Sequence, residues 1–165
     1  MIRAKKDVLV TGGFHRGEDY SGQDDLTFNR IAQLGEEIGV NVLVVREDGL
    51  SSWEEGEERV RRADLIVSGV ERPTWEAGIL GGIGTVFNKP VVLVYFEGRK
   101  VSRMARGAPN VVAEIVYSTG NEAEEAVKHV FHKLRDIYGG EKREKLERVL
   151  FQSSLPSSLK RPANK

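Results

Sequence analysis

Short apolar runs alternate with helix-forming segments along this chain, and no other feature limits the fold as strongly. The runs lie at residues 7–11, 40–45, 64–70, 90–96 and 110–118. Several are apolar almost throughout, as strands are when both faces of their sheet are covered. Strands that alternate with helices over short connections indicate an α/β domain with a largely parallel sheet. We therefore predict five strands joined by right-handed helical crossovers.

Capping signals mark where the helices begin. Ser52 with Glu55 three residues later fits a capping box, and Asn121 is the expected N-cap of the last long helix. We expect residues 1–140 to form the α/β domain. Residues 141–165 should add a C-terminal helix and a basic, Ser/Pro-rich tail.

The composition excludes several classes of function. Hydrophobic residues make up 39% of the chain, charged residues 30%, and the formal net charge is +0, so no global field favours a nucleic acid polymer. No apolar run approaches the roughly 20 residues that span a membrane. The first apolar run is too short for a signal peptide, so we expect a cytoplasmic protein. There is no cysteine, and His129 and His132 have no nearby carboxylate cluster, so we expect no metal site.

In parallel α/β sheets ligands bind at the carboxyl ends of the strands, so the residues after each run are the candidates. The segment "TGGFHRG" (11–17) follows the first run, where Gly12 and Gly13 would let backbone N–H groups approach a ligand. Arg16 could hold a phosphate there. The segment "EGRKVSRMARGAP" (97–109) suits a phosphate or carboxylate ligand, or is only a solvated basic loop.

The stretches "ADLIVSGVERPTWEAGILGGIGTVFNKPVVLVY" and "GRKVSRMARGA" resemble the nucleoside 2-deoxyribosyltransferase family. They are most similar to its 2'-deoxynucleoside 5'-phosphate N-hydrolases, over roughly residues 7–118. The resemblance implies a three-layer, Rossmann-like (flavodoxin-type) five-stranded parallel sheet with helices on both faces, and a homodimer. The implied ligand is a nucleoside or nucleotide, cleaved or transferred at its N-glycosidic bond without a cofactor.

In that family a glutamate attacks the anomeric carbon of the sugar, and an aspartate helps to protonate the leaving base. Asp64 matches the aspartate, following the Ala-Asp of the motif. Leu80 stands where the glutamate belongs, and leucine cannot attack carbon. Glu76 lies one helical turn earlier and is the nearest candidate for the catalytic carboxylate. An acidic residue in the first turn of a helix can also serve the helix dipole alone.

The family's substrate-binding positions carry over with fewer departures. Thr74 replaces a serine that contacts phosphate, and Ser102 matches a later serine with the same role. The loop after the first strand cradles the sugar. The resemblance therefore implies a substrate-binding set of Gly12, Gly13, Phe14, His15, Arg16, Thr74, Ser102, Met104 and Gly107.

Two other functions stay open. Leu80 favours a sensor or binding protein for a nucleotide-derived ligand that has lost the nucleophile. The segment "GGIGT" also resembles the glycine motif of lysine-decarboxylase-like phosphoribohydrolases, although Asn88 stands where those enzymes have a glutamate. Asp64, at the junction of a helix and a strand, could equally be a structural residue that accepts hydrogen bonds from the backbone.

Overall fold

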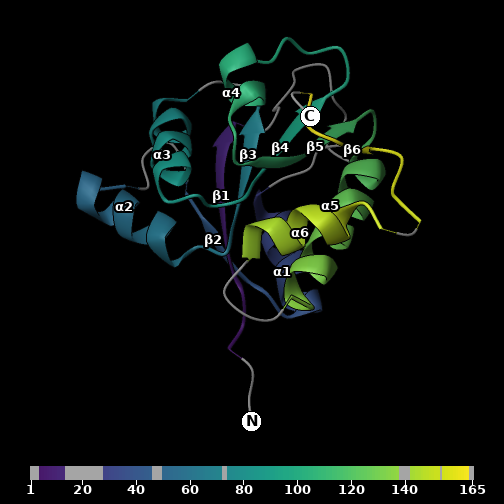
Figure 1. Cartoon of the computed structure of the whole chain (residues 1–165), viewed down its shortest axis with the longest axis horizontal. Coiled ribbons are helices and arrows are strands. Elements are labelled where there is room, and N and C mark those ends of the chain that lie inside the picture. Colours follow the sequence, from purple (N-terminus) through teal and green to yellow (C-terminus); the bar gives the residue numbers. More distant parts are fainter. Residues whose placement is uncertain are drawn as a thin grey trace.

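The structure, a computed structural model, describes residues 4–13, 28–45, 50–71, 74–137, 142–152 and 154–163. Its strands are β1 (Asp7–Gly13), β2 (Asn41–Val44), β3 (Leu65–Val70), β4 (Val91–Phe96), β5 (Val111–Tyr117) and β6 (Leu159–Lys160). Its helices are α1 (Phe28–Ile38), α2 (Trp53–Arg62), α3 (Trp75–Val86), α4 (Arg103–Gly107), α5 (Gly120–Arg135) and α6 (Lys142–Leu150). The strand-helix alternation predicted from the sequence is confirmed (Figure 1).

The strands form one sheet in the order β2-β1-β3-β4-β5-β6, and the first five are parallel. This is the flavodoxin-type order, which reverses direction between β1 and β3. The Rossmann-like α/β fold predicted from the sequence is therefore confirmed. The carboxyl ends of β1 and β3 form the switch point, where this class of sheet binds ligands.

The sheet has a sixth strand where we expected an irregular tail. β6 runs antiparallel to β5, with Leu159 opposite Ile115, and Val116 N donates to Ser158 O at 2.9 Å. Leu159 is buried against the core that contains Leu146 and Leu150 of α6. One buried leucine in a Ser/Pro-rich segment is too weak a pattern to predict a strand.

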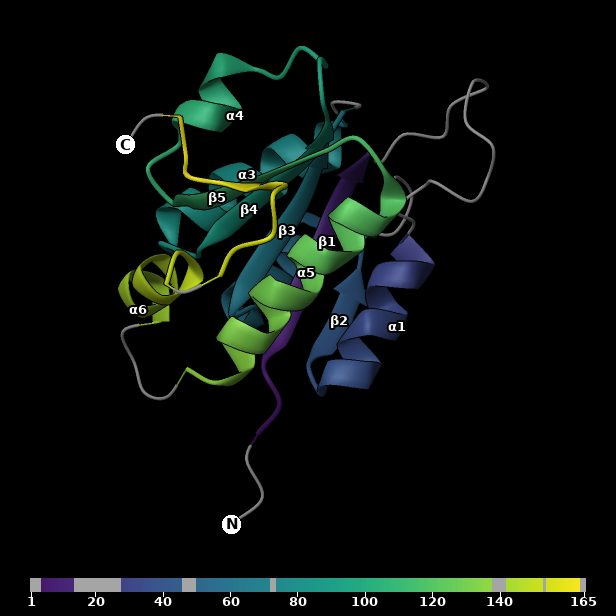
Figure 2. The ribbon, with the colours of Figure 1, turned by 90° about the vertical axis from the view of Figure 1, so that its right-hand side faces the viewer.

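Helices cover both faces of the sheet, as predicted. Buried residues of α1, α5 and α6 pack on one face, and those of α2 and α3 pack on the other. Figure 2 shows α1 and α5 in front of the sheet, with α3 and α4 beyond it. α4 has only five residues, yet the β4 residues on its side of the sheet, Val91, Leu93 and Tyr95, are buried.

Of the two N-caps predicted from the sequence, Ser52 is confirmed and Asn121 is wrong. Ser52 is the N-cap of α2 and accepts a hydrogen bond from Glu55 N at 3.2 Å, while the Glu55 carboxylate accepts from Ser51 N rather than from the cap itself. The N-cap of α5 is Thr119, not Asn121, because Thr119 Oγ1 accepts from Glu122 N. Thr119 lies two positions before Asn121, and its side chain is also a good N-cap, so the helix begins there.

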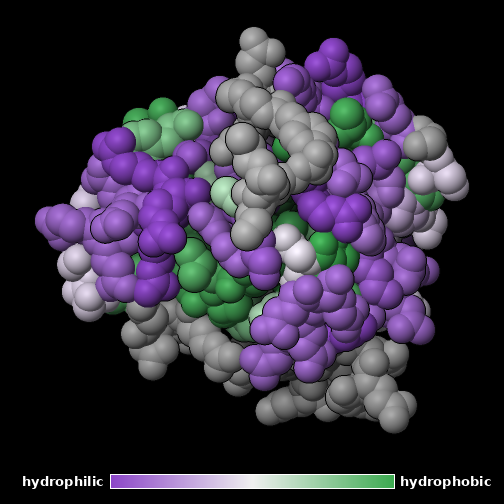
Figure 3. Space-filling model, turned by 90° about the horizontal axis from the view of Figure 1, so that it is seen from below, coloured by the Kyte–Doolittle hydropathy of each residue, from purple (hydrophilic) through white to green (hydrophobic). Residues whose placement is uncertain are grey.

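The end of the molecule where the strands begin is largely hydrophilic, with a hydrophobic band in the middle (Figure 3). Among the described helices, none is both long and apolar enough to cross a lipid bilayer.

Candidate functional site

A cavity of about 430 Å³ lies between α3, α4 and the sheet, a size typical of small-molecule sites. Its polar lining residues include Thr11, Ser68, Thr74, Lys100 and Ser102. The fold thus brings together Thr74, Ser102 and Met104, three residues that the sequence predicts as substrate-binding and that lie on two different helices or their caps.

The hydroxyls of Thr74 and Ser102 both cap helices. Thr74 Oγ1 accepts from Ala77 N at 3.1 Å, and Ser102 Oγ accepts from Ala105 N at 3.5 Å. A hydroxyl that accepts through its oxygen keeps its own hydrogen to donate. Both caps can therefore still donate to an acceptor in the cavity, such as a phosphate oxygen.

Gly12 and Gly13 lie at the carboxyl end of β1, beside Gly69 and Val70 of β3. Gly12 has a positive φ of 97°, and a Cβ there would lie 2.1 Å from Gly69 O. The close approach of two strands thus explains Gly12 without a ligand. Phe14, His15 and Arg16, which complete the predicted loop, lie outside the described residues. Gly107 ends α4 and is exposed.

Asp64 is not brought together with these residues. It directly precedes β3, and its Oδ2 accepts from Asp7 N at 2.9 Å, so it lies at the amino edge of the sheet. Six residues of β3 separate the two edges by about 20 Å at roughly 3.3 Å per residue. This hydrogen bond from a backbone N–H is what we expect if Asp64 is a structural residue rather than a catalytic one.

Two positions on α3 bear on the catalytic carboxylate, Glu76 and Leu80. Glu76 lies in the first turn of α3, two residues after the cap Thr74; its side chain lies outside the description. Leu80 is 0% exposed, and it packs in the core beneath α2, within reach of Gly56. A carboxylate at position 80 would therefore be buried between two helices.

Glu71 is a carboxylate at the carboxyl edge that the sequence reasoning missed. It directly follows β3, and its Oε1 accepts from Tyr117 Oη at 2.8 Å. Its Oε2 is buried and, within the described part of the chain, has no hydrogen-bond partner. The signal that could have revealed it is its place in the sequence, one residue beyond an apolar strand at the switch point.

A buried polar network fixes the outer wall of the cavity. Glu114, in the middle of β5, is 2% exposed and accepts from Arg106 of α4 and from Tyr95 Oη of β4. Burial raises the pKa of Tyr95, and the negative charge of Glu114 raises it further. The network ties α4, which follows Lys100 and Ser102, to the centre of the sheet.

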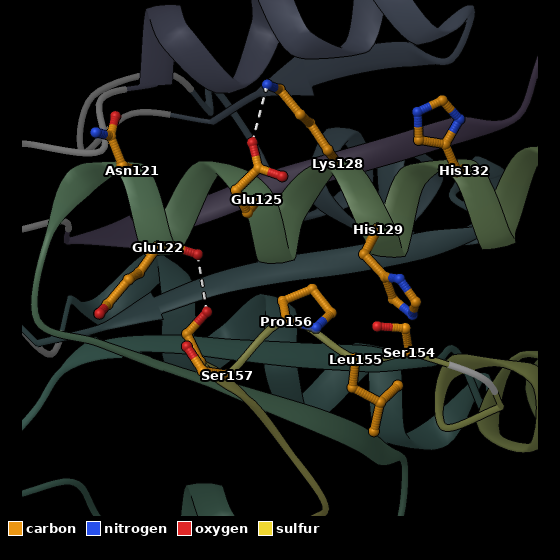
Figure 4. Close-up of a pocket in the computed structure, with 11 residues that line it drawn as sticks. Asn121, Glu122, Glu125, Lys128, His129, His132, Ser154, Leu155, Pro156 and Ser157 are labelled. Atoms are coloured by element: carbon orange, nitrogen blue, oxygen red, sulfur yellow. Dashed lines mark hydrogen bonds and ion pairs between the residues drawn. The ribbon is translucent and has the colours of Figure 1, made fainter.

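A second cavity, of about 650 Å³, lies between α5 and the segment after α6 (Figure 4). Its polar groups bind one another: Glu125 pairs with Lys128, His129 Nε2 contacts Leu150 O, and Ser158 Oγ donates to Glu122 O. Among the described residues, no group of three or more His, Cys, Asp or Glu side chains could hold a metal ion. This cavity lies along α5, on the face of the sheet opposite to α3 and the first cavity.

No protein-family model matches this chain, and no curated protein sequence matches it. Among solved structures, the chain is similar to the CMP N-glycosidase BcmB of Clostridium botulinum, with a TM-score of 0.53 and 18% sequence identity. The match covers 72% of this chain and 94% of that one. At this identity the likeness shows a shared α/β fold.

Proposed function

We propose that this protein binds a nucleoside or its 5'-monophosphate in the cavity between α3 and α4, and cleaves the N-glycosidic bond. The observation that carries the proposal is the convergence of two donor hydroxyls, Thr74 and Ser102, and one cation, Lys100, on a single cavity. The fold likeness to a CMP N-glycosidase supports the same class of ligand, and so does the motif resemblance to the 2-deoxyribosyltransferase family.

Glycosidic cleavage needs a carboxylate close to the anomeric carbon. In the retaining reaction it bonds to that carbon as the bond to the base breaks, the base leaves with a proton, and water releases the sugar. Glu76 is our candidate for this carboxylate, because it lies one turn from the family's position and two residues from Thr74. Glu71 is our candidate for the second carboxylate in place of Asp64. It follows Val70, which lines the cavity, but Glu71 itself is not part of the lining.

The test is a base-release assay on ribonucleoside and deoxyribonucleoside 5'-monophosphates, CMP included. We expect one of them to yield free base, and Glu76→Gln to lose at least 100-fold in rate, within the range attributed to such groups. Glu58→Gln, an exposed residue of α2, is the matched control and should keep the wild-type rate. Full activity in Glu76→Gln would remove Glu76 from the mechanism.

A second candidate function is binding without cleavage. It is favoured by the burial of Leu80 at the family's nucleophile position, and by the lack of a carboxylate among the described residues that line the cavity. In that case a nucleotide would raise the melting temperature with no release of base. Failure of the whole panel to shift the melting temperature or to release base would contradict both functions.

We also propose that the protein forms a homodimer through α3. Trp75 and Val86 are 84% and 79% exposed, and Ile79, between them, is 37% exposed. Their spacing places the three on one side of the helix, next to the glycines at 78 and 82 that line the edge of the cavity. Large exposed apolar patches mark interaction sites, and a two-fold dimer would bury this one against its own copy.

A further inference from the structure

The side of α3 that faces the cavity consists only of glycine, alanine and threonine. Its lining residues are Thr74, Ala77, Gly78, Gly81, Gly82 and Thr85. A Cβ added to Gly78, Gly81 or Gly82 would meet no atom within 4 Å, whereas one on Gly84 would lie 2.7 Å from Ile66 Cδ1. Close packing on the sheet therefore explains Gly84. It does not explain the other three glycines, each of which makes the helix less stable than alanine would.

We call the part of the cavity against these α3 residues the slot, and most of its remaining wall is apolar. Met104, Ala105 and Ala108 line it from α4 and the residue after it, and the sheet contributes Ile66, Val91 and Leu93. A helix side made of glycine presents a flat backbone surface. The wall opposite, from α4, consists of small residues and the flexible side chain of Met104. Such a slot suits a planar ring better than a branched, fully hydroxylated sugar, because the ring needs few polar partners on its faces.

One polar group in the lining independently indicates a ligand. Thr11, on β1, is 1% exposed, and its hydroxyl has no hydrogen-bond partner in the part of the chain that the structure describes. A buried hydroxyl is normally satisfied, because leaving it unpaired is unfavourable. Thr11 can both donate and accept, as the edge of a heterocyclic base requires.

We propose that the planar base of the nucleotide lies in the slot against Gly78, Gly81 and Gly82, with its edge hydrogen-bonded to the hydroxyl of Thr11. This inference rests on the proposed function and adds where the base sits. Gly82 lies eight residues beyond Thr74, about 12 Å along the helix axis at 1.5 Å per residue. That length leaves room for the sugar and phosphate toward Thr74 and Ser102.

The test compares Gly81→Leu, Thr11→Val and the control Glu58→Leu with the wild type. Leucine at position 81 enters open space and favours a helix, so the variant should fold; its apo melting temperature and circular dichroism verify this, and Gly81→Ala is the milder second variant. Glu58→Leu places the same side chain on exposed surface of α2, outside the cavity lining. Binding is measured by calorimetry with the nucleoside monophosphates and, separately, with free nucleobases.

We expect Gly81→Leu to weaken nucleotide binding at least 10-fold and Thr11→Val several-fold, with Glu58→Leu unchanged. Wild-type affinity in folded Gly81→Leu would overturn the slot and leave the proposed function standing. Binding of a free base that is lost in Gly81→Leu, with no nucleotide binding at all, would support the slot and contradict the proposed function. A wild type that binds neither nucleotides nor bases would overturn both.

Discussion

Arg106 of α4 holds the carboxylate of Glu114 in the middle of β5 through two hydrogen bonds, from Nε to Oε1 at 2.7 Å and from Nη2 to Oε2 at 3.3 Å. α4 itself has no buried residue. Two-point contact with a guanidinium fixes direction as well as distance. The pair therefore sets the position of the short helix that forms one wall of the cavity.

Removal of Arg106 should destabilise the protein strongly. Arg106→Met leaves the buried carboxylate of Glu114 without its half-exposed cation, and losing a hydrogen bond to a charged group costs about 1.5 to 3 kcal/mol. The double variant Arg106→Met/Glu114→Leu removes both charges and should recover most of that loss. Urea unfolding measures both, with Lys128→Met as control, because its pair with Glu125 is exposed and worth about 0.5 kcal/mol or less. Equal losses in the single and double variants would contradict this account.

The stability should fall in acid through Glu124. The hydrogen bonds from Arg30, at 2.7 and 3.1 Å, lower the pKa of Glu124 below its ordinary value of 4.5. The stabilisation is therefore fully present above pH 4.5 and is lost as the pH falls through the lower folded pKa. Glu124→Gln should flatten this part of the stability curve. Urea unfolding across the acid range measures this slope. The same slope in the variant and the wild type would show that other carboxylates cause the loss of stability in acid.

Two threonines of the cavity should respond in opposite directions to loss of their hydroxyls. Thr11→Val removes a buried hydroxyl without a partner among the described residues, so the free energy of unfolding should rise by about 1 to 2 kcal/mol. Thr85 Oγ1 contacts Gly81 O at 3.0 Å and Asn110 Oδ1 at 3.1 Å, so Thr85→Val should lower it by about 1 kcal/mol. Thermal unfolding without ligand checks both. A destabilised Thr11→Val would mean that its hydroxyl has a partner.

The sheet was predictable because its signals are local. Continuous apolar runs such as "PVVLVYF" predict buried parallel strands, and the capping box at Ser52 marks the start of α2. The order of the strands came only with the family resemblance, since alternation alone does not say which strands pair. β6 escaped prediction because it has only two residues, of which Leu159 alone is buried.

The site was predictable only in part, for a related reason. Thr74 and Ser102 lie just after strands, so their meeting at one edge follows from a parallel sheet. Asp64 begins a strand, and the same rule should have placed it at the opposite edge. The unpaired hydroxyl of Thr11, by contrast, depends on which atoms surround it after folding, and no sequence pattern reports that.

A charge on the outward side of α3 should separate the proposed dimer without disturbing the fold. Ile79→Glu puts a carboxylate into a patch that the two-fold contact would bury, where an unpaired charge is strongly unfavourable. Analytical ultracentrifugation should show a dimer for the wild type and a monomer for the variant. Glu58→Lys, on exposed surface of α2, is the control. A monomeric wild type at high concentration would rule out the dimer.

Restoring the family's glutamate at position 80 should not create or increase catalysis. Leu80 is 0% exposed and belongs to the core between α2 and α3, so Leu80→Glu would bury a carboxylate away from the cavity that α4 closes. The loss of apolar packing and the buried charge together should lower the free energy of unfolding by about 3 kcal/mol or more. The control Leu80→Met, which conserves volume, should cost less than about 1.5 kcal/mol. Faster base release by Leu80→Glu than by the wild type would mean that position 80 reaches the ligand, and that the proposed role of Glu76 is wrong.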